Sequence, residues 1–227
     1  MSIAKEQREK LIWEFPNIGK KAPEQEEKAF AYCEGYKEFL NVAKTEREFV
    51  REAVLRLKEA GYEEFEEEKI YQPGDKVYQI NRKKALLMST FGKRPLEDGV
   101  RINVAHIDSP RLDLKPNPLY EKAEAAYFKT HYYGGIRKYQ WATIPLAMHG
   151  VVILKDGTSV DICIGEKEGD PVFCVTDLLP HLAAQQNERK LKDGIKGEEL
   201  NIIVGSLPYP CEEIGRASCR ERVSLRV

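Results

Sequence analysis

The chain has 227 residues, of which 42% are hydrophobic and 32% charged, values typical of a globular protein with a sizeable core. Its net charge of −1 gives no basic surplus for binding nucleic acid and no acidic tail. The polar start MSIAKEQREK is unlike a signal peptide, and no apolar run approaches the roughly 18 residues of a membrane helix. The sequence therefore predicts a cytoplasmic protein with no nucleic-acid or membrane partner.

Two amphipathic helices are predicted near the amino terminus. Residues 24–42 place apolar side chains at helical spacing. Thr45 and Glu48 form the pattern of a capping box for a second helix. Gly61 follows the last apolar position of that helix and is expected to end it.

The spacing of apolar residues then changes to that of strands. Residues 76–81 and 85–90 predict two strands joined by a polar turn, and residues 101–106 predict a third. The short apolar runs at 85–88 and 102–105 are typical of strands covered by helices on both faces. Residues 1–110 are therefore interpreted as the first part of an α/β layered domain.

The character changes again after Pro110, where further prolines precede segments rich in β-branched and aromatic residues. The predicted β segments are 125–135, 141–154 and 156–165, and residues 171–191 predict a strand followed by a short helix. Residues 111–211 are therefore expected to form a second, β-rich unit inserted into the first domain.

The last residues differ in composition from the rest of the chain. The final 14 residues contain four arginines and no lysine, whereas the preceding 213 contain 10 arginines and 22 lysines. The stretch EIGRASCRERV also resembles the translation of a sequencing-library adapter. We expect residues 212–227 to be a non-native tail on a truncated reading frame.

The residues that suggest chemistry are His106 and Asp108, which follow the apolar run at 102–105. A neutral imidazole is a good zinc ligand, and its second nitrogen usually donates to a carboxylate or carbonyl. An Asp two positions on projects from the same side of an extended chain. A structural polar pair remains the alternative, because HxD occurs by chance and a catalytic zinc needs about three protein ligands.

The surroundings of this pair resemble a known family. HIDSPRLDLKPNPLYE at 106–121 and YFKTHYYGGIRKYQWATIPLAMHGVV at 127–152 look like the M18 metallo-aminopeptidases, in particular the bacterial branch of the aspartyl aminopeptidase type. DLLPHLA at 177–183 and GSLPYP at 205–210 are similar to the same family. The resemblance covers most of residues 1–211.

This resemblance implies a zinc enzyme with two metal ions. It also implies an α/β/α catalytic domain interrupted by a β-rich domain that serves oligomer assembly. By the family pattern His106 is a metal ligand and Asp108 the catalytic carboxylate that supports it. The family's bridging Asp, Glu-Glu pair and late Asp and His have no counterpart that can be placed here. Glu212 and Glu213 resemble the Glu-Glu pair, but they follow GSLPYP too closely to be it.

The full-length parent is thus expected to be a zinc aminopeptidase that forms a homo-oligomer and acts on peptides with acidic or neutral amino-terminal residues. The fragment itself is expected to be inactive. Arg111, Lys115 and Arg137 are candidates for binding a substrate carboxylate, with solvated surface charge as the alternative. Two other functions remain open: a non-catalytic assembly or adaptor module with a structural His-Asp pair, and a metal hydrolase for another amide.

Overall fold

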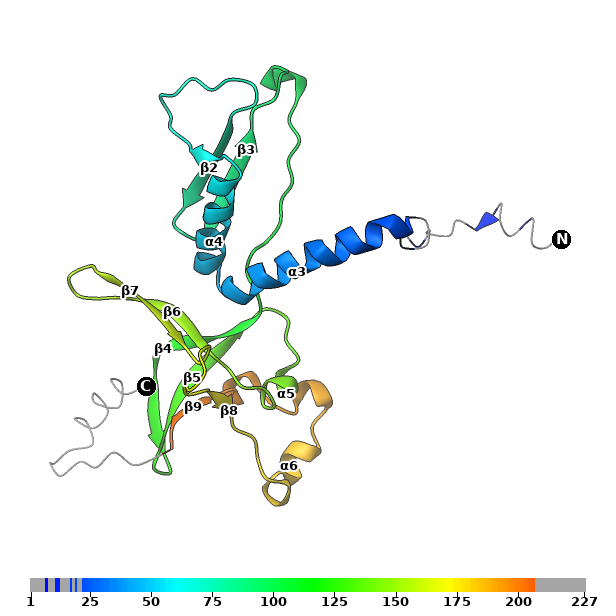
Figure 1. Ribbon diagram of the computed structural model, residues 1–227. Helices are drawn as coiled ribbons and strands as arrows, with labels where there is room; N and C mark the ends of the chain where they lie inside the picture. The colour runs from blue at the N-terminus through cyan, green and yellow to red at the C-terminus, as the bar shows by residue number, and fades with distance from the viewer. Residues whose placement is uncertain (1–6, 8–10, 13–16, 18, 20–21, 207–227) are drawn as a thin grey trace. The chain divides into compact units, whose positions relative to one another are not determined.

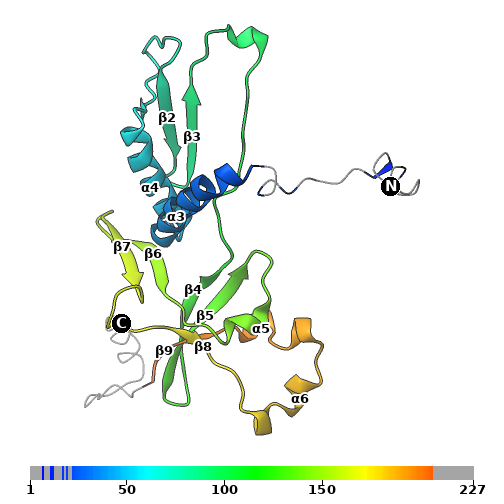
Figure 2. The ribbon, with the colours of Figure 1, turned by 45° about the vertical axis from the view of Figure 1, so that its right-hand side comes forward.

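The computed structural model describes residues 7, 11, 12, 17, 19 and 22–206, so the predicted tail lies outside the described residues. The chain divides into two units, residues 1–103 and 104–227. Each unit combines helices and strands (Figures 1 and 2), which confirms the predicted mixed α/β class.

The first unit contains two helices and a small sheet. Its elements are η1 (Pro23–Gln25), α3 (Glu26–Val42), α4 (Glu46–Glu59), β1 (Glu63–Glu64), β2 (Lys76–Asn81), β3 (Ala85–Thr90) and η2 (Leu96–Asp98). The sheet order is β1-β2-β3, with β1 parallel and β3 antiparallel to β2. Arg82 and Lys83 both have positive φ in the turn between β2 and β3, as a tight hairpin turn requires.

Helix α4 begins where the capping box predicts. The Thr45 hydroxyl accepts from the Glu48 backbone N–H at 3.4 Å, and Glu48 Oε2 accepts from the Thr45 N–H at 2.9 Å. Val50 and Val54, one turn apart, are the buried residues of this helix, which contacts β2. The amphipathic pattern therefore places one face of α4 in the core of the first unit.

The prediction of a strand at residues 101–106 is wrong. Residues 101–110 form no ladder, and Ile102 and Val104 are 74% and 90% exposed. A strand needs a neighbour that satisfies its backbone groups, and the described chain supplies none for this segment. The expected cover of β3 by helices on both faces is also wrong: α4 contacts β3, but Leu87 and Met88 are exposed.

The second unit is dominated by strands. Its elements are β4 (Arg111–Lys122), β5 (Ala125–Tyr133), α5 (Lys138–Trp141), β6 (Met148–Ile153), β7 (Ser159–Ile164), β8 (Cys174–Val175), η3 (Pro180–Leu182), α6 (Ala184–Asn187), η4 (Leu191–Asp193), η5 (Gly197–Glu199) and β9 (Ile202–Gly205). One antiparallel sheet has the order β4-β5-β9-β8 (Figure 1), and β6 and β7 form a separate hairpin.

The longest strand, β4, is one that the sequence pattern did not predict. Pro116 and Pro118 lie inside it, and proline cannot donate to a ladder. The structure accommodates both by placing β4 at the edge of the sheet and by shifting its register against β5 between Leu114 and Leu119.

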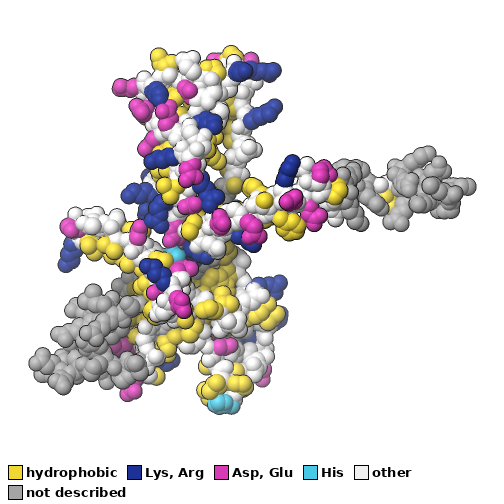
Figure 3. Space-filling model, viewed as in Figure 1, with side chains coloured by type: hydrophobic (Ala, Val, Ile, Leu, Met, Phe, Trp, Pro, Cys, Tyr) yellow, Lys and Arg dark blue, Asp and Glu magenta, His cyan; other side chains and the backbone are white. Residues whose placement is uncertain are grey.

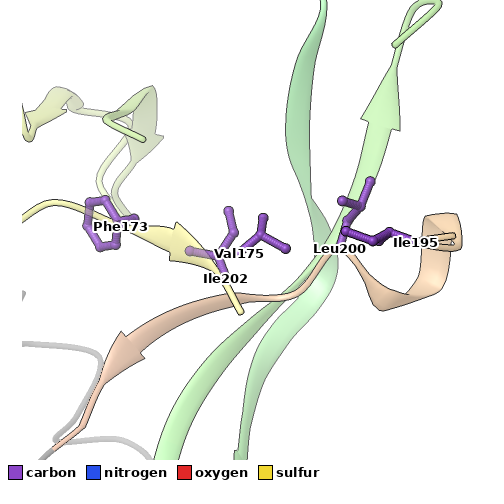
Figure 4. Packing of buried hydrophobic residues seen from close by; sticks show 5 residues of the cluster. All are labelled: Phe173, Val175, Ile195, Leu200 and Ile202. Atoms are coloured by element: carbon purple, nitrogen blue, oxygen red, sulfur yellow. The ribbon is translucent and has the colours of Figure 1, made fainter. Parts of the chain in front are cut away.

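The core of the second unit lies on the β8-β9 side of its sheet. Phe173, Val175, Ile195, Leu200 and Ile202 form a buried cluster (Figure 4). Val175 of β8 pairs with Ile202 of β9, so these two side chains lie together in the cluster. This small core fixes the carboxyl-terminal strands to β5, the strand that also borders the candidate site.

The surface carries mixed charge and many apolar groups. Figure 3 shows acidic, basic and hydrophobic side chains interspersed over the visible face. Among the residues that the structure describes, no helix combines the length and the apolar character needed to cross a bilayer.

Candidate metal site at His106 and Asp108

His106 and Asp108 lie on the extended segment that leads into β4, and the structure brings their side chains together. His106 Nδ1 is 3.1 Å from the carbonyl oxygen of Asp108 and 3.2 Å from its Oδ1. Because a carbonyl oxygen only accepts, Nδ1 carries the proton. The tautomer that results leaves the lone pair of Nε2 for a metal ion, on a ring that is 84% exposed.

Asp108 is held in its charged form. A hydrogen bond from Tyr133 is the largest influence that lowers the pKa of its carboxyl group; its own backbone N–H and His106 also lower this pKa, and partial burial opposes them. The side chain is one-third exposed. Asp108 is therefore a carboxylate that can orient the neighbouring imidazole.

Pairing of β4 with β5 explains why Tyr133 reaches this loop. Arg111 at the start of β4 pairs with Tyr133 at the end of β5. The Arg111 guanidinium lies 4.3 Å from the centre of the Tyr133 ring, and it donates to Asp113 at 2.7 Å and to the Ser109 carbonyl at 3.4 Å. Arg111 thereby links the tyrosine to the loop that carries Asp108.

The residues present fit only one position of a zinc site. His106 offers a nitrogen with suitable chemistry, yet the described part of the chain contains no group of three or more His, Cys, Asp or Glu side chains that could hold a metal ion. A catalytic zinc needs about three protein ligands. Glu212 and Glu213 lie outside the described residues.

Two of the three candidate charges form ion pairs within the second unit. Arg111 pairs with Asp113, and Lys115 with Glu198 at 2.5 Å. An open cleft of about 560 Å³ includes Lys115 and Glu198 in its lining but neither His106 nor Asp108. Arg137 precedes helix α5 as its N-cap residue.

The other histidines lie in different settings. His149 is largely buried and pairs with Glu166 at 2.9 Å. His131 stacks on Tyr132, and His181 is exposed in η3.

The sequence pattern alone did not single out Tyr133 as a residue of the candidate site. The residue is one of several tyrosines in a strand pattern, and nothing in its local sequence sets it apart. The feature that identifies Tyr133 is the pairing of β4 with β5. This pairing places Tyr133 opposite Arg111, three residues after Asp108.

Known structures share this fold. A crystal structure of an M18 family aminopeptidase from Thermotoga maritima matches with a TM-score of 0.82 and 42% identity, over 93% of this chain and 46% of that one. Aminopeptidase I from Clostridium acetobutylicum matches with a TM-score of 0.78 and 41% identity, over 96% of this chain and 49% of that one.

Relatives found by sequence carry names of the same kind as these structures. A protein of Clostridium acetobutylicum named "Probable M18 family aminopeptidase 1" is 49% identical over 203 residues, which are 87% of this chain and 44% of the relative. The chain thus spans less than half the length of this relative. The family model described as Aminopeptidase I zinc metalloprotease (M18) matches residues 39–216. The chain therefore belongs to the M18 family of zinc metalloproteases.

Proposed function

We propose that the full-length protein containing this chain is a zinc-dependent aminopeptidase that removes amino-terminal residues from peptides. The observation that carries the proposal is the His106–Asp108 pair, with Nδ1 bonded to Asp108 and Nε2 left for a metal ion. Family membership supplies the reaction class. Two zinc ions would activate water and polarise the scissile carbonyl.

In this proposal the chain supplies one metal ligand, His106, and the carboxylate that orients it. The remaining ligands and the general base come from polypeptide that the relatives have beyond the matched part. The 227-residue chain by itself is then inactive, because one histidine cannot hold a catalytic zinc.

The proposal extends to substrate, assembly and location. The proposed substrates are peptides with either an acidic or a neutral amino-terminal residue. Arg111 and Lys115, the candidates for binding an acidic side chain, already pair with Asp113 and Glu198, so a preference for acidic residues is not part of the proposal. Homo-oligomer formation through the second unit is supported by exposed apolar side chains on the β6-β7 hairpin, among them Val152 and Ile153. The proposed location is the cytoplasm.

The first experiment is a long sequence read of the gene across codon 211, followed by expression of the complete reading frame. We expect bound zinc and chelator-sensitive cleavage of aminoacyl anilides. We expect His106→Ala to lose at least roughly 100-fold in activity, since replacing even the outer partners of metal ligands costs about 10- to 100-fold. His181→Ala changes an exposed histidine elsewhere in the chain and is the matched control.

Two results would overturn parts of this proposal. A gene that truly ends at Val227 would leave no complete metal site, and a non-catalytic assembly module would become the better description. Chelator-sensitive peptide cleavage by the purified 227-residue chain would show that the fragment is active.

A further inference from the structure

Asp108 lies between two groups that its carboxylate can bind at once. His106 Nδ1 faces Oδ1 at 3.2 Å, and the Tyr133 side chain hydrogen-bonds to the same carboxylate. A phenol donates to a carboxylate, so the two hydrogen bonds together fix how the carboxylate is rotated. With only one of them, the carboxylate could turn about its terminal torsion, which is broad in energy.

Tyr133 is itself fixed by contacts on the sheet. It pairs with Arg111 in the β4-β5 register, and the Arg111 guanidinium lies over its ring. The next residue, Gly134, lies beside Pro110: an added Cβ would make ordinary van der Waals contact with the proline Cγ, at 3.5 Å. The end of β5 therefore lies against the loop from Asp108 to Pro110.

We propose that Tyr133 is a positioning residue: its hydroxyl orients the Asp108 carboxylate, which in turn holds His106 with Nδ1 protonated and Nε2 turned toward the metal. The hydrogen-bonded chain Tyr133–Asp108–His106 connects a sheet strand to the ligand. The metal part of this inference rests on the proposed function, whereas the hydrogen-bonded chain rests on the geometry of the second unit alone.

The test uses the metal-free 227-residue chain and nitrogen NMR of its histidines at about pH 8, where a typical histidine is neutral. A His106→Gln variant assigns the His106 signals. We expect Tyr133→Phe to lower the ratio of the Nδ1–H to the Nε2–H tautomer of His106 about threefold, the effect of weakening one hydrogen bond. The Asp108 carbonyl still accepts from Nδ1, so the ratio does not collapse.

Tyr132→Phe is the matched control, because it removes the same hydroxyl from the adjacent residue, whose ring stacks on His131. This variant should leave the His106 ratio unchanged. In an Asp108→Ala background, which removes the shared acceptor, Tyr133→Phe should have no further effect if the tyrosine acts through the carboxylate. An unchanged ratio in Tyr133→Phe, or an equal change in both tyrosine variants, would overturn the inference.

A second variant covers a failure of Tyr133→Phe to fold. Fluorotyrosine at position 133 keeps the ring and alters the strength of the donor, so the tautomer ratio should shift while the phenol stays protonated, and no change would contradict the inference. A negative result for the role of Tyr133 can be distinguished from a failure of the proposed function. Zinc bound by the full-length protein and lost in His106→Ala would still support the metal site if Tyr133 proved to have no influence.

Discussion

At the residue scale, the approach of β5 to the candidate site depends on the glycine that follows Tyr133. Gly134 has φ +82°, a left-handed conformation that costs other residues about 1–2 kcal/mol, and an added Cβ would contact Pro110. We expect Gly134→Ala to lower the free energy of unfolding of the second unit by about 1–2 kcal/mol. Urea denaturation followed by Trp141 fluorescence and circular dichroism measures this change.

Gly135→Ala is the control for this prediction, because an added Cβ at Gly135 meets nothing within 4 Å and the residue lies outside the left-handed region. We expect its effect to stay within about 0.5 kcal/mol. Equal losses in the two variants would show that the backbone conformation of Gly134 is not what matters.

At the scale of the element, the segments that the sequence predicts well are those determined locally. The strands at 76–81 and 85–90 have the predicted bounds because a tight turn joins them and each is the other's partner. Residues 101–106 have a similar apolar pattern but no partner in the described chain, and the pattern alone could not show that. Strand β4 was not predicted because its prolines are tolerated only in an edge strand. Whether a strand lies at the edge is a property of the whole sheet, which the local sequence does not show.

The same contrast applies to the candidate site. His106 and Asp108 are two residues apart, so their contact could be predicted from the sequence, whereas the link from Tyr133 to Asp108 depends on the register between β4 and β5. Remaining metal ligands were not predictable from this chain for a simpler reason. The resemblance assigns a ligand role to His106 alone, and the other ligands of the family pattern have no position that matches here.

The connection between β5 and the segment before β9 provides a prediction at the same scale. The Thr130 side chain on β5 donates to the Leu200 carbonyl, and Thr130 is 2% exposed. Thr130→Val keeps the shape but leaves this buried carbonyl without its donor, so we expect a loss of about 1–3 kcal/mol in the free energy of unfolding. Urea denaturation of Thr143→Val provides the comparison, since Thr143 donates to the Gln140 carbonyl at an exposed position. A similar loss in Thr143→Val would contradict the role of burial.

At the scale of the whole molecule, the two units should respond differently to acid. The carboxyl groups whose pKa is lowered include Asp156, Asp170 and Glu198, all in the second unit. Backbone N–H groups lower the pKa of Asp156 and Asp170, and a hydrogen bond from Lys115 lowers that of Glu198. A carboxyl group with a lowered folded pKa stabilises the fold above its unfolded pKa, and this stability is lost as the pH falls.

Since unfolded Asp and Glu titrate near pH 4, we expect the second unit to lose more stability than the first between about pH 6 and pH 3. Hydrogen exchange resolved along the chain at the two pH values measures each unit separately. Asp170 accepts from the backbone N–H groups of Gly165 and Lys167 at 3.0 and 3.1 Å, so Asp170→Asn should reduce the pH dependence of the second unit. Asp193→Asn removes an equal charge from exposed η4 and should reduce it less. Equal acid sensitivity of the two units would mean that these hydrogen-bonded carboxylates do not control the acid response.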